Sequence, residues 1–375
     1  MRGDRCRRGG NAPGPRPCGR GGGARGADRV TARGLIVRQA GLAASVQDLG
    51  RPGYQRQGVA EGGAVDPRAL VAGAAILGQA PDLAAVELVG MGGQYEAFGG
   101  AVRVALTGAA FKASLDGRPV RWNTSFVIEP GQVLALGGCE PDSGVYGYLH
   151  LGGGIEVPRV LGSRSTHLRA VFGGHQGRLL RAGDRLVAGP DAAGKVGLTF
   201  DSPWEEHPKV VRVLWGVQAG EFAPAERERF TATTFTVTPA RDRMGMKLDF
   251  QGAPFVTERS LTLISDAVVL GDVQIPGDGK PIVLLADRQP TGGYPRLATV
   301  ITADLPALAQ LPAGARFRFQ PVSEAMAVEA LKRYRHELGG LAAAVRPVLR
   351  SLDDVAYLLS VNLIDGVISG DMDDQ

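Results

Sequence analysis

Glycine and proline restrict the fold of this chain more than any other feature. The 375 residues include 55 glycines and 24 prolines, about a fifth of the total. Both residue types are unfavourable inside long helices and common in tight turns. The sequence therefore predicts a mainly β protein, with many short strands, many turns and only a few helices.

The basic residues are concentrated at the start of the chain. Residues 1–34 contain nine arginines and two aspartates, a local charge of +7, whereas the rest of the chain has 33 basic and 36 acidic residues. A Gly/Arg-rich segment of this kind could be an arm that binds RNA or a membrane. Because the segment contains no aromatic residue, we predict instead a disordered basic tail over 1–34.

The remaining composition excludes several classes of protein. Only three cysteines occur, Cys6 and Cys18 in the tail and Cys139 in the body, so a disulfide framework is not expected and a cytoplasmic location is predicted. The tail has no apolar segment typical of a secretory signal, and no run of eighteen apolar residues predicts a membrane span. Aromatic residues make up 6% of the chain, which does not favour a nucleic-acid partner.

Short apolar runs separated by turns follow the tail. One helix is predicted among them, because Asp66 is a good N-cap, Pro67 suits the first turn and Gly78 is a typical stop. A short sequence pattern, in which a glycine turn precedes a strand, occurs three times, at 130–134, 182–186 and 313–317. The three segments resemble equivalent corners of β-barrels or sandwiches.

We place a domain boundary near residue 205. Residues 201–208 contain two prolines and show no periodicity, as expected of a linker. The boundary divides the body into β-rich blocks at 35–205 and 206–322. Residues 323–375 are predicted to form a C-terminal helical extension.

Two helical segments are expected within that extension. Ser323 would cap a helix that ends at Gly339-Gly340. A second helical segment is predicted around 358–364.

Three polar bends in the second block carry most of the candidate chemistry. The first contains Asp242 and Arg243 before a glycine, and the second contributes Gln274. The third follows the apolar run 282–286 and contains Asp287, Arg288, Gln289, Thr291, Gly292, Gly293 and Tyr294. Consecutive glycines let the backbone approach a ligand closely. We predict that the bends converge on one cleft, although each alone could be a hairpin with an ion pair.

A fourth polar loop lies in the first block. Arg164 stands between Ser163 and Ser165, where it could bind a carboxylate or phosphate in bidentate fashion or cap the loop. The five histidines have no paired spacing, so no metal site is predicted. No P-loop motif occurs, and ATP, if it is used, is not held by a P-loop in this chain.

Five motifs resemble those of the biotin-dependent carboxyltransferase family. They are SVQDLGRPGYQRQGV at 45–59, LGSRSTHL at 161–168, and DRMGMKL, GDVQIPGDGKPI and DRQPTGGYPRLATV in the second block. The motifs occur in the family's order between residues 35 and 322. The family includes the C subunit of bacterial 5-oxoprolinase, proteins called allophanate hydrolase subunit 2, and the carboxyltransferase part of urea carboxylase. The resemblance implies tandem cyclophilin-like β-barrel domains, followed by the helical extension.

The resemblance also implies an enzyme that acts on a compact amide. Its leading implication is the C subunit of an ATP-dependent 5-oxoprolinase, a hydrolase that opens 5-oxo-L-proline to L-glutamate together with separate A and B subunits. One alternative is a carboxyltransferase component that acts on carboxybiotin and urea, or a related amide, with biotin on a separate carrier. Another is a non-catalytic regulator that binds the partner subunit.

Amide carbonyls are weak electrophiles, so a site must polarise the oxygen and move a proton. By resemblance, catalytic roles fall to Asp242, Arg243, Asp287, Gln289 and Tyr294. Substrate-binding roles fall to Gln274, Arg288, Thr291, Gly292, Gly293, Arg164 and Ser165. Two departures from the family pattern, Arg241 in place of a serine and Pro290 in place of a threonine, predict a changed substrate preference.

Overall fold

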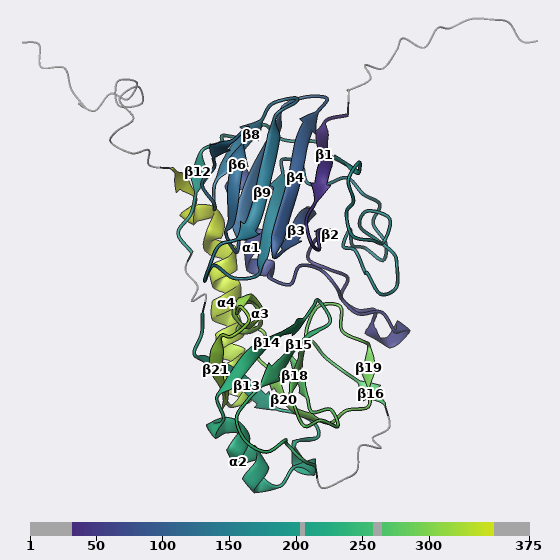
Figure 1. The fold of residues 1–375 in the computed structure, drawn as a ribbon, viewed down its shortest axis with the longest axis vertical. Helices are drawn as coiled ribbons and strands as arrows, with labels where there is room; N and C mark the ends of the chain where they lie inside the picture. Colours follow the sequence, from purple (N-terminus) through teal and green to yellow (C-terminus); the bar gives the residue numbers. More distant parts are fainter. Residues whose placement is uncertain (1–31, 203–206, 258–264, 349–375) are drawn as a thin grey trace, which may run out of the picture. The chain divides into compact units, whose positions relative to one another are not determined.

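The computed structural model describes residues 32–202, 207–257 and 265–348. The described residues form a mainly β fold with few helices, as predicted (Figure 1). Residues 1–31 of the predicted tail and the predicted helical segment around 358–364 lie outside them. The first strand begins at Gly34, the last position assigned to the tail.

One large antiparallel sheet contains all strands of the first β-rich block except β12 (Leu198–Thr199). Its eleven strands, counted over the described residues, are β1 (Gly34–Ala40), β2 (Ser45–Gln47), β3 (Ala85–Val89), β4 (Met91–Phe98), β5 (Val102–Gly108), β6 (Phe111–Leu115), β7 (Arg118–Pro119), β8 (Ser125–Ile128), β9 (Val133–Cys139), β10 (Tyr146–Leu151) and β11 (Arg185–Val187). The order is β7-β6-β9-β4-β3-β10-β5-β8, with β1 joining β4 to β11 and β2 pairing with β3. Buried hydrophobic side chains, most of them aliphatic, form its core.

Strands of the second block close into a barrel. In barrel order they are β13 (Val210–Trp215), β20 (Arg296–Val300), β17 (Asp272–Gln274), β18 (Ile282–Leu284), β15 (Gly245–Asp249), β14 (Phe235–Arg241) and β21 (Arg316–Pro321). A cluster of phenylalanines fills the interior, with Phe230 stacked on Phe319 at a centroid distance of 4.9 Å. Two short pairs complete the β structure: β12 (Leu198–Thr199) with β22 (Arg346–Pro347), and β16 (Asp266–Ala267) with β19 (Thr291–Gly292).

The three predicted glycine corners share one hydrogen-bonding pattern. Gly131, Gly183 and Gly314 all have φ between 85 and 91°. Each donates its N–H to the carbonyl of a strand residue, and that residue donates back to the carbonyl that follows the glycine. The strand residues are Ala97, Val37 and Val237. Positive φ explains why glycine occupies all three corners.

The helices are α1 (Pro67–Leu77), α2 (Pro224–Ala232), α3 (Leu305–Gln310) and α4 (Glu324–Ala344), with 3₁₀ turns η1 (Gln55–Gln57) and η2 (Ala219–Glu221). Helix α1 begins and ends as predicted. The Asp66 carboxylate accepts the Arg68 N–H, and Gly78 adopts a left-handed conformation with φ 63°. Ser323 caps α4 in the same way, accepting from Met326.

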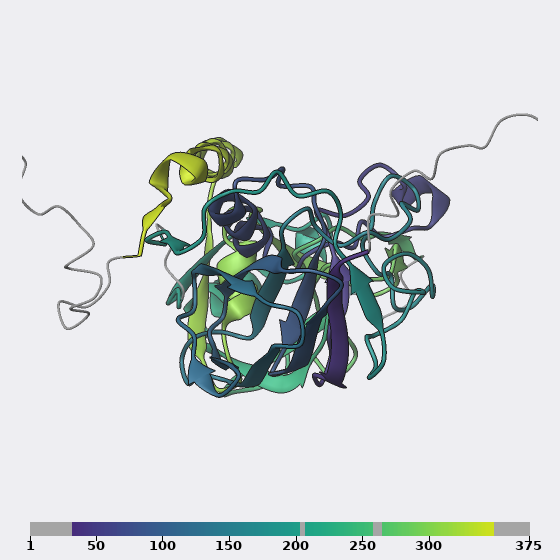
Figure 2. The same cartoon turned by 90° about the horizontal axis from the view of Figure 1, so that it is seen from above.

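The predicted end of α4 at Gly339-Gly340 is wrong, because the helix continues to Ala344. Leu338 and Leu341, on either side of the glycine pair, pack against Ile76 and Leu77 of α1. Figure 1 shows α4 from the side as one helix, coloured yellow, and Figure 2 shows it nearly end-on. Tertiary packing therefore carries the helix through two residues that would end it in isolation.

Candidate functional site

The candidate site is a cavity of about 570 Å³ where described residues of the sheet and of the barrel meet. Apolar side chains form most of its walls: Leu42, Val89, Val145, Leu168 and Leu179. Its charged groups lie in or next to three of the predicted motifs, and they are Arg169, Arg241, Asp242, Arg243 and Asp287. An apolar cavity with a few convergent polar groups is typical of a small-molecule site.

A buried ionic network forms one side of this cavity. The Arg243 Nε and Nη2 atoms donate to the Asp287 carboxylate at 2.8 and 2.9 Å, and Nη1 donates to Glu87 Oε1. Nη2 also donates to the Gly63 carbonyl at 2.7 Å. Burial lowers the pKa of Arg243, but the Glu87 and Asp287 carboxylates outweigh it and hold this pKa well above its ordinary value.

The second oxygen of Glu87 is also occupied. Glu87 Oε2 accepts from the Val65 N–H at 2.8 Å and from the Tyr148 hydroxyl at 2.7 Å. The network thus joins β3 of the sheet to the loops that follow β14 and β18 of the barrel. Because most N–H groups of Arg243 point at protein oxygens, this guanidinium orients Asp287 more directly than it could bind a substrate.

Asp242 is the more accessible of the two predicted proton acceptors. Its Oδ1 accepts from the N–H groups of Met244 and Gly245 at 2.7 and 3.2 Å, which fixes the turn between β14 and β15. Its Oδ2 accepts no hydrogen bond from the described residues, and the side chain is exposed. Both oxygens of Asp287, by contrast, accept from Arg243.

Arg241, the cation that departs from the family pattern, caps a helix. It donates to the carbonyls of Ala309 and Leu311 at the C-terminal end of α3, where the helix dipole favours a cation. Its guanidinium also lies 5.6 Å from the centre of the Tyr146 ring. The added charge therefore serves the packing of α3 on the cavity wall.

The 45–59 and 161–168 motifs bind each other next to the network. Asp48 accepts from the Ser163 hydroxyl at 2.6 Å and from the Arg164 N–H at 2.5 Å, while Arg51 donates to the Ser165 carbonyl. Ser165 is buried, and Arg164 is half-buried with Nε and Nη1 unpaired among the described residues. The structure therefore places Arg164 and Ser165 in a tightly bonded loop, whose next residues line the cavity.

His167 belongs to this loop. Burial lowers the pKa of its imidazole, and the nearby Asp287 carboxylate opposes that shift while the Arg51 and Arg243 cations add to it. Its Nδ1 accepts from the Ala170 N–H at 3.2 Å. The imidazole is therefore neutral near pH 7, with Nδ1 engaged in the loop.

The predicted convergence of all three bends on one cleft does not occur. Gln289 donates to Gln274 at 3.3 Å, and Gly292 adjoins both amides, but none of the three lines the cavity of Arg243. Thr291 and Gly292 pair with β16 instead, and Gly293 is half-buried beside the exposed Tyr294. A separate short sheet accounts for this separation.

Arg288 points away from Asp287. It is buried and lines a second cavity with Gln55 and Glu61. The chain turns at Ala286 and Asp287, where the Arg288 N–H bonds to the Leu285 carbonyl, and Asp287 and Arg288 line different cavities.

Two residues at the site were not predicted from the sequence. Glu87 lies in the middle of the apolar strand β3, and a carboxylate at such a position is a signal that a buried partner exists. Arg169 directly follows the 161–168 motif. It is exposed, lines the cavity, and makes no ion pair with the described residues.

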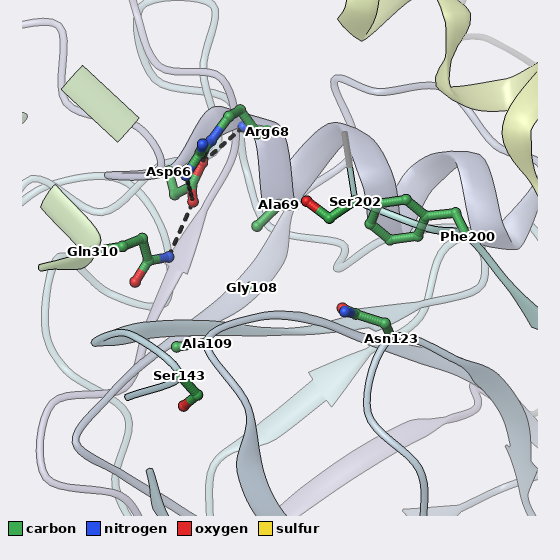
Figure 3. A pocket seen from close by; sticks show the side chains of 10 residues that line it. All are labelled: Asp66, Arg68, Ala69, Gly108, Ala109, Asn123, Ser143, Phe200, Ser202 and Gln310. Atoms are coloured by element: carbon green, nitrogen blue, oxygen red, sulfur yellow. Dashed lines mark hydrogen bonds and ion pairs between the residues drawn. The ribbon is translucent and has the colours of Figure 1, made fainter. Parts of the chain in front are cut away.

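A smaller pocket lies at the N-terminus of α1 (Figure 3). Its volume is about 30 Å³, which is room for about one water molecule. Asp66 within it bonds to Arg68 and to Gln310. This pocket is therefore too small for a substrate, and the hydrogen bonds of Asp66 connect the start of α1 to Gln310 of α3.

Two kinds of feature are absent from the described residues. No group of three or more His, Cys, Asp or Glu side chains there is placed to hold a metal ion. No helix among them is long and apolar enough to cross a membrane.

The family model called carboxyltransferase domain, subdomain A and B, matches residues 57–321. The chain belongs to this family. It is 38% identical to the C subunit of 5-oxoprolinase from Haemophilus influenzae over 282 residues, which cover 75% of this chain and 88% of that protein. It is 36% identical to the C subunit of 5-oxoprolinase from Escherichia coli over 302 residues, or 79% of this chain and 94% of that protein.

A solved structure of the same family shares the fold. The Kluyveromyces lactis urea carboxylase superposes with a TM-score of 0.75 at 25% identity, covering 86% of this carboxyltransferase-family chain. The match spans 30% of the urea carboxylase chain. The mainly β architecture is thus that of one part of a longer enzyme.

Proposed function

We propose that this chain is the C subunit of an ATP-dependent 5-oxoprolinase complex, which hydrolyses 5-oxo-L-proline to L-glutamate. The similarity to two 5-oxoprolinase C subunits carries the proposal, because it extends over 88% and 94% of their lengths. The name of those relatives implies further subunits, so the chain acts with subunits of the A and B types. ATP hydrolysis by the complex supplies free energy, and no P-loop in this chain holds the nucleotide.

The 570 Å³ cavity is the proposed substrate site. A lactam ring is compact and largely apolar, which suits the walls formed by Leu168 and Leu179. The carboxylate of 5-oxoproline needs a cation. Arg243 is paired with carboxylates and Arg241 donates to carbonyls of α3, whereas Arg169 has neither kind of partner among the described residues. Asp242, with one oxygen free, is the proposed proton acceptor. Arg243 then holds Asp287 in place as a fixed negative charge.

The remaining predicted site residues keep supporting roles in this proposal. Gln274 and Gln289 orient each other beside Gly292. Tyr294, which is 47% exposed, is available to a partner subunit that would complete this region.

Reconstitution tests the proposed activity. The purified chain is mixed with the A- and B-type subunits of the same organism, and glutamate release from 5-oxoproline is followed with and without ATP. We expect turnover only in the complete mixture with ATP. Absence of turnover in every combination, with all subunits folded, would overturn the assignment.

Two substitutions test the substrate anchor. Arg169→Gln should raise the KM for 5-oxoproline about tenfold or more, because a charged hydrogen bond is lost, whereas Arg169→Lys should recover part of it. The neutral lactam 2-pyrrolidinone has no carboxylate, so its turnover, if measurable, should not change. An equal effect on both lactams would show that Arg169 does not bind the carboxylate.

A second candidate function is a carboxyltransferase component that uses carboxybiotin and urea or a related amide. The superposition on urea carboxylase favours it. In biotin a polar ureido ring is fused to an apolar, sulfur-containing ring. The cavity offers Asp242 and Arg169 to the ureido ring and apolar walls to the rest. Transfer of labelled carboxylate from a biotinylated carrier to urea would support this candidate, and tight binding to the companion subunits without any turnover would support a regulator.

The proposed domain organisation follows the family. Residues 35–205 and 206–322 correspond to two cyclophilin-like subdomains, and the closed barrel lies in the second. Residues 323–375 form the C-terminal extension, of which α4 is described. A cytoplasmic location fits the low cysteine content and the proposed use of ATP.

A further inference from the structure

Residues in the N-terminal half of α4 line a second large cavity. Its volume is about 490 Å³, and it continues into a smaller cavity of about 180 Å³ that shares Glu61, Leu270, Thr302 and Leu305. We call the two together the α4 groove. Its walls are mainly apolar, with Leu214, Leu270, Leu305, Ala327, Val328 and Leu331 among them. The proposed substrate cavity shares none of these residues.

Helix α4 leaves part of its apolar stripe uncovered. Ala330, Tyr334 and Leu341 are the buried residues of this 21-residue helix. Toward the C-terminal end the stripe packs on α1, but Ala327 and Leu331 border the groove and stay half-exposed. A helix gains most of its stability by burying such a stripe. Part of the apolar face in the N-terminal half of α4 is therefore left uncovered in the described structure.

The rim of the groove is apolar as well. Val269 from the barrel and Val328 from α4 line it, and each is 45% exposed. Met326, in the same turn of α4, is 56% exposed. Contiguous exposed apolar surface of this kind marks interaction sites in proteins.

The charged groups at the groove show what kind of partner it fits. They are Glu61, Glu324 and Arg288. Arg288 is 2% exposed, whereas Glu324 is exposed and Glu61 half-exposed. The Glu61 backbone carbonyl accepts from the Arg51 N–H, but neither glutamate carboxylate forms a hydrogen bond or close ion pair with the described residues. The accessible charge at the rim is thus negative.

We infer that the α4 groove docks an amphipathic segment of a partner chain, with leucine- or phenylalanine-sized side chains flanked by Lys or Arg. The acidic rim disfavours residues 349–375 of this chain, which contain six aspartates and one arginine. The basic residues 1–31 lack aromatic side chains to fill an apolar groove. Residues 258–264 carry one Glu and one Arg, and so bring no net positive charge.

A peptide probe tests this inference on the full chain. The probe is a labelled helix-forming peptide with leucines at i, i+3, i+4 and i+7 and lysines at both flanks, and its binding is followed by fluorescence polarisation. A matched peptide carries glutamates in place of the lysines. Val328→Glu should weaken binding of the lysine peptide about tenfold or more. Val217→Glu is the control, because Val217 is 77% exposed and does not line the groove.

The outcomes separate the possible occupants. Preference for the lysine peptide, lost in Val328→Glu and kept in Val217→Glu, supports the inference. Equal binding of the two peptides, or an unchanged affinity in Val328→Glu, overturns it. A disulfide that forms readily between Val328→Cys and Leu263→Cys in the isolated chain would show that the chain fills its own groove, and this also overturns the inference.

That the partner chain is a companion subunit of the 5-oxoprolinase complex rests on the proposed function. Val328→Glu should then prevent co-elution with the companion subunits on gel filtration, while Val217→Glu should not. If the unmodified chain fails to join those subunits, the proposed function fails, and the peptide experiment still decides the groove.

Discussion

Arg243 carries a positive charge in an almost water-free position, held by two carboxylates. Replacing it with leucine would leave Glu87 and Asp287 buried without their partner. We expect Arg243→Leu to lower the free energy of unfolding by about 3–5 kcal/mol, measured by urea denaturation. Lys247→Ala is the control, because the Lys247–Asp278 pair of 2.6 Å is partly exposed and should contribute less than about 1 kcal/mol.

Similar losses in the two variants would show that the network adds no special stability. The comparison also matters for activity, since an inactive Arg243 variant is informative about catalysis only if it is folded.

His150 is the clearest source of pH-dependent stability. Burial lowers the pKa of this fully buried imidazole from 6.5 to about 3. Its Nε2 lies 2.8 Å from Thr107 Oγ1, and Thr107 donates to the Ala69 carbonyl, so Nε2 carries the proton of the neutral ring. Unfolding therefore takes up a proton at any pH between about 3 and 6.5. Stability from this group is complete above pH 6.5 and is lost as the pH falls toward 3.

The variant His150→Gln keeps a donor for Thr107 and cannot titrate. Between about pH 6 and 4 the original protein should lose up to about 1.4 kcal/mol per pH unit more than this variant. The measurement is the unfolding free energy in urea at several pH values. Parallel pH profiles for the two proteins would contradict the assignment.

At the scale of secondary structure, α1 and α4 differ in what determines their ends. The glycine that ends α1, Gly78, has φ 63°, whereas Gly339 and Gly340 are helical residues inside α4. None of the three has another atom within 4 Å of an added Cβ. Gly339→Ala and Gly340→Ala should each stabilise the protein by about 0.5–1 kcal/mol, and Gly78→Ala should destabilise it by about 1 kcal/mol.

Thermal unfolding of the three variants checks this expectation. A lower midpoint for Gly340→Ala than for Gly78→Ala would show that the glycine pair is needed as a hinge in α4.

The same contrast shows what the sequence could predict about elements. The limits of α1 were predictable because Asp66 and Gly78 act through contacts within the first and last turns. The end of α4 was not, because Leu338 and Leu341 depend on α1, about 260 residues earlier in the chain. Local signals decide an element only where packing does not oppose them.

At the scale of the whole molecule, the same limit applies to the site. The sequence predicted polar bends at strand ends, and the structure does bring Asp242, Arg243 and Asp287 to one cavity. The sequence could not predict which bends share that cavity, because this depends on closure of the barrel and on the β16–β19 pair. Glu87 was missed since its partner lies 156 residues away.

Gln310 joins the barrel block to the large sheet through all the hydrogen-bonding positions of its amide. Its Oε1 accepts from the N–H groups of Val145 and Tyr146 at 2.8 and 2.9 Å. Its Nε2 donates to Asp66 at 3.0 Å and to the Tyr146 carbonyl at 2.9 Å. Gln310→Leu would leave several buried polar groups unpaired, and we expect a loss of about 3 kcal/mol or more.

Because these bonds couple the two β blocks, differential scanning calorimetry should show one transition for the original chain and a broadened or divided transition for Gln310→Leu. Gln132→Leu is the matched control, since Gln132 Oε1 accepts a single bond from Glu129 within an exposed turn. A single sharp transition in Gln310→Leu, with its midpoint unchanged, would mean that the blocks are coupled elsewhere. The Arg243 network, which also connects β3 to the barrel loops, would then be the coupling to test next.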